Sequence, residues 1–352
     1  MKLILSLLLV STTCLASLGH KKLISGQGVI WGMDFLPGEK EIIFTERKGK
    51  IFRYHLETKK ILEISGGPKV VARNQGGLLD IKISPKFKAD QKVYMTYSKP
   101  MGTNKTTALA VGVLKDNQIT ELKDLFIAKG ESTYNHHFGS RLAFDKDQYI
   151  FMTIGDRGYP ENAQTLSNHY GKVLRLNMDG SAPKDNPFVG IKNALPEIWS
   201  YGHRNPQGLV LADKLYEMEH GPQGGDEINT VEPGKNYGWP IITYGVQYGS
   251  GEKIGIGTHK EGMEQPIKKY IPSIAPSGMA FYPHKKFPEL TGSILSGSLK
   301  FTHLNVVDRF GKNEKRLFGD LGQRVRSVLV SEKGDVFFGT DEGNIFQITA
   351  SK

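Results

Sequence analysis

The segment Asn135–Arg141 carries the side chains best suited to acid–base chemistry. In it, His136 and His137 are adjacent and precede a Gly-Ser turn and a strand. Neighbouring residues on a strand point to opposite faces, so the two imidazoles could not easily bind one metal ion. One of them facing a cavity would titrate near neutral pH and could serve as a general base. A pair of ordinary loop histidines is the alternative, and spacing alone favours it.

A second segment, Glu219–Asn229, is rich in glycine and contains several acidic residues. Calcium prefers many hard oxygen ligands, including backbone carbonyls, in a flexible geometry. The glycines and proline of this segment expose carbonyls well, and Asp226 and Glu227 add negative charge. The spacing does not match an EF-hand. A polar turn is the alternative, and the residues alone do not decide between the two.

Basic residues recur in glycine-rich or turn contexts: Arg204 in a Gly-His-Arg-Asn-Pro segment, Lys300 after Gly-Ser-Leu, and Arg324 with Arg326. Arg324 and Arg326 are two residues apart, so on a strand they share a face. Two arginines on one face are costly unless they are solvated or matched by an anion such as a carboxylate. A solvated strand face is the simpler interpretation when these residues are considered alone.

Several common catalytic fingerprints are absent. The sequence contains no zinc-protease motif, no P-loop and no dinucleotide-binding fingerprint. It also lacks the Gly-x-Ser-x-Gly nucleophile elbow. These absences leave a possible cation site, a possible anion site and a candidate histidine base.

The elements that must position these residues are short strands separated by turns, and helical periodicity is weak throughout. The 41 glycines and 17 prolines supply the turns. The sequence therefore predicts an all-β chain, and its clearest expected strands are Glu41–Thr45, Lys50–Tyr54, Lys92–Tyr97, Tyr149–Ile154, Lys172–Asn177, Asp335–Thr340 and Asn344–Thr349.

A loose internal repeat narrows the architecture. Similar strand–turn–strand units begin at Glu41, Gln148 and Asp335. Units of this kind spaced along a chain are typical of β-propeller blades, whereas a β-sandwich is the alternative. The first and last copies lie near the two ends of the sequence, as closure of a ring requires. No domain boundary is evident, and the stretch Tyr244–Gln265 is expected to be a long loop.

The first residues have the layout of a secretory signal peptide. Lys2 precedes an apolar run over Leu3–Val10 and a small, polar stretch that ends near Ser17. A transmembrane anchor is the alternative, but the run is too short to span a bilayer. We therefore expect a signal peptide over residues 1–17, one domain over residues 18–352, and a periplasmic or secreted protein without a membrane span.

Composition excludes further classes of site. Cys14 is the only cysteine and falls within the expected signal peptide, so the mature chain would have neither a disulfide nor a thiolate metal site. The formal net charge is +10, but the basic residues are spread along the chain. No nucleic-acid-binding motif is present, so nucleic acid is not an expected partner, and the charge is best explained by a solvated surface that can attract an anionic ligand.

At these same segments the sequence resembles the soluble glucose and sorbosone dehydrogenases that depend on pyrroloquinoline quinone (PQQ), especially bacterial aldose sugar dehydrogenases. The resemblance runs from about Gly32 to Ile348. No segment is decisive alone, but together and in order they are specific. They are Gln75–Asp80 with Ser84-Pro85, His136–Leu142, Thr153–Gly158, Gly202–Gly208, Glu219–Asn229, Asn236–Pro240, Pro272–Gly278, Gly297–Lys300 and Arg324–Arg326.

The resemblance implies a six-bladed β-propeller with PQQ bound over the central channel. It places the general base on His137. It also implies roles for three further groups of residues: Gln75 and Asp156 on the substrate side; Arg204, Asn205, Lys300, Arg324 and Arg326 at the cofactor; and the carbonyls of Gly221 and Pro222 at the cofactor calcium, with Asp226, Glu227 and Tyr237 near a second, structural calcium.

The implied reaction is oxidation of an aldose at its anomeric carbon to a lactone. His137 would take the hydroxyl proton while hydride leaves for the quinone, and Ca²⁺ would polarise the quinone oxygen. Three carboxylates on PQQ suit a cluster of lysine and arginine. Electrons must then pass to an external acceptor. Glucose-specific members carry an acidic residue where this chain has His136, so a broader range of aldoses is expected.

Two other functions remain open at this point. Propellers of related fold also serve as non-catalytic binding modules, and fold alone does not imply function. A calcium-dependent lactonase or other hydrolase is the second alternative, and it would need calcium ringed by side chains in the central channel. The sequence also leaves open whether the protein is a monomer or a homodimer.

Overall fold

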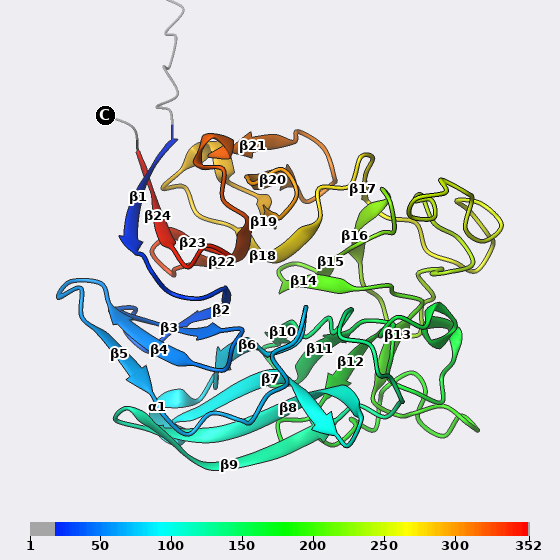
Figure 1. The fold of residues 1–352 in the computed structure, drawn as a ribbon, viewed down its shortest axis with the longest axis horizontal. Coiled ribbons are helices and arrows are strands. Elements are labelled where there is room, and N and C mark those ends of the chain that lie inside the picture. The colour runs from blue at the N-terminus through cyan, green and yellow to red at the C-terminus, as the bar shows by residue number, and fades with distance from the viewer. Residues whose placement is uncertain (1–17, 351–352) are drawn as a thin grey trace, which may run out of the picture.

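The computed structural model describes residues 18–350, which form six four-stranded antiparallel sheets arranged around a central axis (Figure 1). This confirms the six-bladed β-propeller and excludes the β-sandwich. The expected signal peptide, residues 1–17, lies outside the described residues. In chain order the blades are: blade 1, β2 (Ile30–Phe35), β3 (Glu41–Glu46), β4 (Ile51–His55), β5 (Ile61–Ile64); blade 2, β6 (Leu78–Ile83), β7 (Lys92–Met101), β8 (Asn104–Lys115), β9 (Gln118–Ile127); blade 3, β10 (Leu142–Phe144), β11 (Ile150–Ile154), β12 (Lys172–Leu176), β13 (Ile198–Tyr201); blade 4, β14 (Pro206–Leu211), β15 (Leu215–Glu219), β16 (Asp226–Thr230), β17 (Lys268–Tyr270); blade 5, β18 (Pro276–Tyr282), β19 (Ser293–Ser298), β20 (Leu304–Asp308), β21 (Lys315–Leu317); and blade 6, β22 (Val325–Val330), β23 (Val336–Thr340), β24 (Ile345–Ala350), β1 (Leu18–Ile24).

Helical structure is confined to short connections between strands. These are α1 (Phe87–Asp90), η1 (Pro160–Gln164), η2 (Pro288–Leu290) and η3 (Gly319–Leu321). None of the helices in the described part of the chain is long and apolar enough to cross a membrane. The stretch expected to be a long loop lies between β16 and β17, where residues 231–267 contain neither a helix nor a strand.

The expected strands agree with the structure to within two residues at each end, with one exception. The strand expected over Lys92–Tyr97 continues to Met101, because it pairs with β8 in a long hairpin that reaches Met101 opposite Asn104. Pro100 lies near the tip of this hairpin, and its fixed φ and missing N–H made the strand appear to end earlier.

The ring closes through the two ends of the described chain. β1 pairs with β24 in antiparallel register, with Leu18 opposite Ala350 and His20 opposite Ile348. Blade 6 therefore combines three C-terminal strands with one N-terminal strand, which joins the first and last parts of the chain in one sheet. Such a closure holds the two ends of the described chain in one blade, so the first and last blades cannot separate without breaking this sheet.

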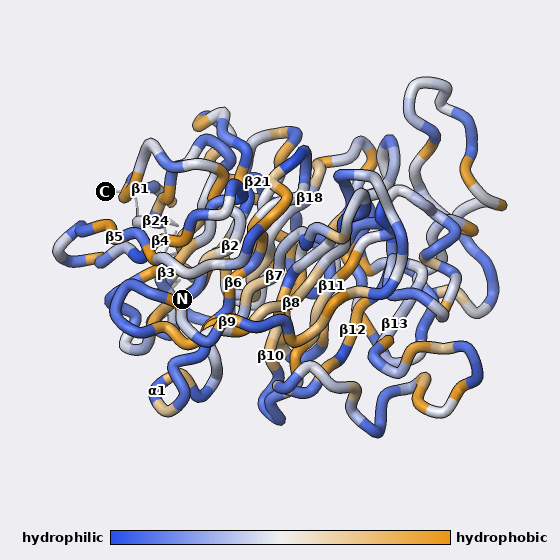
Figure 2. Tube along the Cα trace, turned by 60° about the horizontal axis from the view of Figure 1, so that its bottom comes forward, coloured by the Kyte–Doolittle hydropathy of each residue, from blue (hydrophilic) through white to orange (hydrophobic). Residues whose placement is uncertain are grey.

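The core lies between the blades. Each of the six large clusters of buried apolar residues combines side chains of two neighbouring blades; Ile43 and Ile51 of blade 1, for example, pack with Leu78 and Met95 of blade 2. Figure 2 shows the corresponding hydrophobic stretches along the strands, with hydrophilic segments in many connecting loops. Burial between sheets rather than within one sheet makes the blades mutually dependent.

One end of the propeller gathers the residues singled out in the sequence. Neighbouring strands are antiparallel, so the start of the innermost strand and the end of the second strand lie at the same end of each blade. In five of the six blades, this end of the innermost strand carries a register shift: Ile30/Gly32, Leu78/Ile81, Pro206/Gly208, Pro276/Met279 and Val325/Ser327. Bulges of this kind bend a strand and redirect its side chains, which suits a site built at that end.

Candidate active site

His137 lies in the loop before β10 and is paired with Asp156, which follows β11. Their side chains meet with His137 Nδ1 2.7 Å from Asp156 Oδ1. Asp156 also accepts hydrogen bonds from the Gly158 N–H and from Trp239 Nε1, both at 2.8 Å. Donors therefore reach both of its oxygens, as suits an ionised carboxylate, which can only accept hydrogen bonds. His137 must therefore carry its proton on Nδ1, which leaves Nε2 free to accept another proton.

The charge state of this pair suits a base. Burial lowers the pKa of His137, and the Asp156 carboxylate offsets only part of that effect. Burial by itself would raise the pKa of Asp156, but His137 and its hydrogen bond bring that pKa below the usual value. At neutral pH the pair is therefore a neutral imidazole held by a carboxylate, as general-base catalysis requires.

The backbone around His137 is held in an unusual conformation. His137 has a φ of +56°, in the left-handed region that few non-glycine residues adopt. Its N–H donates to Gln75 Oε1 at 2.8 Å, and its carbonyl lies so close to Gly155 that a Cβ there would be 2.3 Å from the oxygen. Left-handed residues persist where their surroundings over-determine them, and they cluster at active sites.

Arg157 fixes the preceding part of this loop. Its guanidinium donates to the carbonyls of His136, Tyr134 and Lys105, and it stacks on the Phe138 ring at 3.5 Å. The His136 ring lies 4.5 Å from that of His137, and burial together with His137 lowers the pKa of His136 to about 4. Both histidines are therefore neutral at neutral pH, and the surface beside the base carries no extra charge from His136.

Three of the expected basic residues meet near blades 5 and 6. Arg324 and Arg326 bind one carboxylate, that of Asp341, at distances of 2.9 and 2.7 Å from their Nε atoms. Asp341 is therefore the anion that matches Arg324 and Arg326, which were expected to share one face of a strand. Burial alone would raise its pKa, but Arg326 above all lowers it. Lys300 is exposed. It lies near Arg324, because Arg324 Nη1 donates to the carbonyl of the preceding residue, Leu299.

Arg204 and Asn205 lie between β13 and β14, next to the His137 loop. Arg204 Nη1 donates to the carbonyls of His220 and Gly221 at 3.2 and 2.8 Å, and its guanidinium lies 5.3 Å from the Trp239 ring. Asn205 Oδ1 accepts the Gly139 N–H at 3.2 Å. Arg204 Nε and His220 Nε2 are buried without a hydrogen-bond partner in the described part of the protein. Unpaired buried polar atoms are rare and here indicate a site for a ligand.

The acidic glycine-rich loop is shaped by Asp226. Its Oδ1 accepts the Gly221 N–H at 3.0 Å, and its Oδ2 accepts three donors of the loop before β18, namely Ser273 Oγ, Ile274 N and Ala275 N. Burial raises the pKa of Asp226 to about 6. Asp226 therefore joins blades 4 and 5, and protein donors occupy both its oxygens.

The other two residues expected near a second cation differ in their surroundings. The Tyr237 hydroxyl donates to the Thr230 carbonyl at 2.6 Å and accepts the Glu232 N–H at 2.9 Å. Glu227 instead lines a small, partly open space of about 10 Å³, together with Arg204, Glu219, Gly221 and Tyr237. A space of this size admits one water or one ion.

The structure thus brings the expected residues to one end of the propeller in three groups: His137 with Gln75 and Asp156; Arg204 and Asn205 with Gly221, Pro222 and Glu227; and Lys300 with Arg324 and Arg326. Sequence reasoning missed Asp341, which follows β23 without a distinctive motif, and the contact of Trp239 with Asp156. Trp239 lies in one of the quoted segments, but its separation of 83 positions from Asp156 hides the contact.

Comparison with known proteins identifies the family of the chain. The family model "Glucose / Sorbosone dehydrogenase" matches residues 28–347. The chain is 38% identical to aldose sugar dehydrogenase YliI of Escherichia coli over 325 residues, covering 89% of this chain and 87% of that protein. It is 32% identical to quinoprotein glucose dehydrogenase B of Acinetobacter calcoaceticus over 320 residues, covering 81% and 64%.

A solved structure shows the same architecture. The crystal structure of the soluble aldose sugar dehydrogenase from Escherichia coli in its apo-form superposes with a TM-score of 0.91 at 35% identity, covering 95% of this chain and 100% of that one. The family model covers most of the chain, and two relatives above 30% identity cover more than four-fifths of it. The chain therefore belongs to the glucose/sorbosone dehydrogenase family and is an oxidoreductase.

Proposed function

We propose that the protein oxidises aldose sugars at the anomeric carbon to lactones, using PQQ as the cofactor and Ca²⁺ beside it. The observation that carries the proposal is the His137–Asp156 pair, whose 2.7 Å hydrogen bond leaves His137 Nε2 free at the end of the propeller that also gathers the basic residues. A quinoprotein relative at 32% identity supports a quinone cofactor for the same fold.

The residues present fit a quinone with three carboxylates. Within residues 18–350, neither Arg204 nor Lys300 forms an ion pair with a carboxylate, so their charge is available to an anion. Arg204 Nε and His220 Nε2 are buried polar atoms that still need partners. Arg324 and Arg326 add donors, although Asp341 already uses part of their capacity. Arginine forks pair well with carboxylates.

When bound, PQQ would supply a two-electron acceptor for hydride, and Ca²⁺ would polarise its quinone oxygen. The chain's own residues prepare the sugar. His137 Nε2 takes the proton of the anomeric hydroxyl, and Asp156 keeps Nδ1 protonated and stabilises the resulting imidazolium. Gln75 uses its carbonyl oxygen to hold the His137 N–H, which leaves its NH₂ group for a sugar hydroxyl. Electrons then leave for an external acceptor.

For calcium, the carbonyls of Gly221 and Pro222 would bind the ion beside the cofactor. Gly221 suits this role, since a Cβ there would lie 2.3 Å from two loop carbonyls, so the loop is tight. Of the residues assigned to a second calcium, Glu227 faces the small, partly open space, whereas Asp226 and the Tyr237 hydroxyl are hydrogen-bonded within the protein. We assign Glu227 the ligand role and Asp226 and Tyr237 that of holding the loops around it.

His136 supports a broad range of aldoses as substrates. It is neutral at neutral pH, because burial and His137 lower its pKa to about 4, so it offers no charged hydrogen-bond acceptor to a particular sugar hydroxyl. We further propose that residues 1–17 are a signal peptide and that residues 18–352 act as one domain in the periplasm or outside the cell. The structure describes residues 18–350 as one closed ring.

The test is titration of purified, metal-stripped protein with PQQ, with and without Ca²⁺, followed by dye reduction across a panel of aldoses. Calcium-dependent binding with sugar-driven dye reduction would support the proposal. Absence of binding at saturating PQQ would overturn it, and lactone hydrolysis without PQQ would instead identify a hydrolase. Binding without turnover of any aldose would overturn the substrate assignment.

Replacing the base separates chemistry from binding. We expect His137→Ala to bind PQQ as wild type does but to oxidise sugars about 10²-fold or more slowly. The variant lacks the imidazole nitrogen that takes the hydroxyl proton. Stopped-flow reduction of the bound cofactor would measure this step. Wild-type turnover in the variant would remove His137 from the mechanism.

A further inference from the structure

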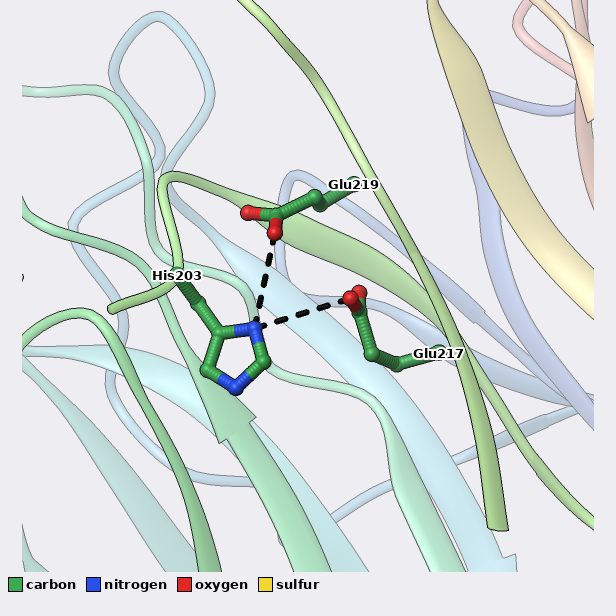
Figure 3. Close-up of side chains that lie close together, drawn as sticks. All are labelled: His203, Glu217 and Glu219. Atoms are coloured by element: carbon green, nitrogen blue, oxygen red, sulfur yellow. Dashed lines mark ion pairs between the residues drawn. The ribbon is translucent and has the colours of Figure 1, made fainter. Parts of the chain in front are cut away.

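A buried cluster outside the proposed base and cofactor residues lies between β15 and the loop that follows β13. It consists of His203, Glu217 and Glu219, whose side chains point toward one another (Figure 3). His203 Nδ1 lies 3.5 Å from an oxygen of Glu217 and 3.5 Å from an oxygen of Glu219. All three side chains are buried, and the three potential ligand atoms lie within 4.8 Å of one another.

Polar atoms of this cluster lack partners. Within the described residues, His203 Nδ1, Glu217 Oε2 and the neighbouring Asn229 Oδ1 are buried and make no hydrogen bond of normal geometry. A buried charged or polar atom left without a partner is costly. These atoms belong to neighbouring side chains, since Asn229 Nδ2 donates to Glu217 Oε1 and His203 Nδ1 lies 3.5 Å from that same oxygen, so their lack of partners indicates a ligand in this cluster.

The charges of the cluster favour a cation. Glu219 is directly opposite Glu227 in the β15–β16 register, and Glu217 is opposite Asn229, so the two buried carboxylates of the cluster lie beside a third that is partly buried. The carboxylates of Glu217 and Glu219 both lie beside His203 Nδ1, so a divalent ion bound among them would face two buried negative charges.

Each of the three side chains is already oriented by a neighbour. His203 Nε2 lies 2.8 Å from Ser200 Oγ, and the ring stacks on Tyr237 at 4.6 Å. Glu217 Oε1 accepts Asn229 Nδ2 at 2.8 Å, and Glu219 Oε2 accepts the backbone N–H of Arg204. Metal ligands in proteins are commonly held by such outer hydrogen bonds, which fix the imidazole tautomer and the carboxylate direction.

The donor set and its spacing identify the class of ion. Zinc binds imidazole nitrogen and carboxylate oxygen at about 2.0–2.2 Å, so the ligand atoms of a tetrahedral site lie about 3.4 Å apart. The two observed separations of 3.5 Å match this spacing. Calcium sites in proteins use oxygen ligands, whereas imidazole suits zinc, copper, iron and nickel.

We propose that His203 Nδ1 and one carboxylate oxygen each of Glu217 and Glu219 bind a divalent first-row transition-metal ion such as zinc. Its three ligands differ from the residues assigned above to calcium, although Glu219 also lines the space that Glu227 faces. The ion would tie the loop that carries Arg204 and Asn205 to β15 of blade 4. Its role is therefore structural, and the proposal does not depend on the cofactor or on the substrate.

The test is a calorimetric titration of metal-stripped protein with Zn²⁺ in the presence of excess Ca²⁺, which occupies any calcium site. We expect one Zn²⁺ per chain and a rise in the thermal midpoint, because binding to the folded state alone stabilises it. Glu217→Gln preserves shape and the contact with Asn229 but removes a ligand charge, so its affinity for Zn²⁺ should fall about 10²-fold or more. Glu252→Gln, an exposed control, should bind Zn²⁺ as wild type does.

A second measurement keeps the proposal testable if Glu217→Gln does not fold. Crystals of the wild-type protein grown with Zn²⁺ should give an anomalous peak at the zinc edge, bounded by His203, Glu217 and Glu219. Absence of Zn²⁺ binding in the presence of Ca²⁺, unchanged affinity in Glu217→Gln, or a peak elsewhere alone would overturn the proposal. The cluster would then be a protonated His203 paired with two glutamates.

Discussion

At the scale of single residues, the site depends on which protonation state each buried group adopts. His137 is surrounded by Asp156, Gln75 and the Gly155 backbone, so both its tautomer and its direction are determined by hydrogen bonds. Its pKa is lowered by burial, and Asp156 partly restores it. The carboxylate therefore influences both the fraction of active base and its orientation.

Replacing Asp156 with asparagine tests this dependence. Burial would continue to lower the pKa of His137, but the opposing effect of the carboxylate would be lost. The acid limb of the kcat/KM profile should therefore move to lower pH. The plateau should also fall by about 10²-fold or more, because an amide in place of the carboxylate no longer requires the proton to be on Nδ1. If the variant and the wild type gave the same pH profile of kcat/KM for sugar oxidation, the proposed role of the His137–Asp156 pair would be contradicted.

Arg326 and Arg324 should separate affinity from stability. Both Arg324→Met and Arg326→Met should weaken PQQ binding about tenfold or more, since each removes a donor for a carboxylate. Only Arg326 is buried, so only Arg326→Met should also lower the free energy of unfolding substantially, by about 3 kcal/mol, as Asp341 loses its main partner.

Equilibrium PQQ titration and urea unfolding of the same preparations measure the two effects. Unchanged PQQ affinity in both variants would remove these arginines from the cofactor site. Equal stability losses in both variants would show that Asp341 does not distinguish the buried arginine from the exposed one.

At the scale of elements, the active-site loops are positioned by close backbone contacts at the ends of strands. The loop before β10 packs on the end of β11, where Gly155 leaves room for the His137 carbonyl. Arg157, two residues further on, holds the carbonyls of His136 and Tyr134. One strand end thus positions both the base and its partner Asp156.

Gly155→Ala tests this contact without changing any group that does chemistry. The added Cβ would lie 2.3 Å from the His137 carbonyl oxygen, so the loop must shift. A shift of about 1 Å can cost about 10²-fold in rate. We expect kcat for sugar oxidation to fall by about that factor.

Gly319→Ala is the matched control, because the nearest atom to its added Cβ is 3.9 Å away. Steady-state kinetics of both variants at saturating PQQ supply the measurement. Similar kcat values for Gly155→Ala and wild type would show that the loop can move without affecting the base.

At the scale of the whole molecule, Arg141 joins the blades across the centre of the ring. It lies at the start of blade 3, and its buried guanidinium donates to the carbonyls of Trp31 at 2.9 Å, Gln207 at 2.7 Å and Arg326 at 2.9 Å. It also contacts Asp80 at 3.3 Å. These partners belong to blades 1, 4, 6 and 2, so one side chain connects five of the six blades.

Arg141→Met should therefore destabilise the fold by about 3–5 kcal/mol, because it leaves the Asp80 carboxylate and several carbonyls buried without their partner. Arg309→Met is the control. Arg309 pairs with Asp213 on the surface, where an ion pair contributes about 1 kcal/mol or less. Urea unfolding monitored by tryptophan fluorescence compares the two, and equal losses would contradict a central role for Arg141.

Much of the fold could be predicted from the sequence, since strand positions depend on local patterns of apolar and turn residues. The expected strands near Glu41, Tyr149 and Asp335 appear within one or two residues of their expected bounds. The strand from Lys92 was predicted too short, because Pro100 resembles a strand end and only the pairing with β8 carries the strand past it. The number of blades came from the resemblance to a family, and the structure confirms it.

The sequence by itself determined an all-β chain with repeated units, and it identified the segments around His137, Arg204 and Arg326, because residue type and local spacing are visible in one dimension. Only the tertiary structure decided which atoms meet. Packing of neighbouring blades brings Trp239 to Asp156, pairing of β22 with β23 brings Arg326 to Asp341, and Asp226 connects blades 4 and 5. These contacts join residues 15 to 83 positions apart, and their geometry depends on how neighbouring sheets pack, which no local pattern records.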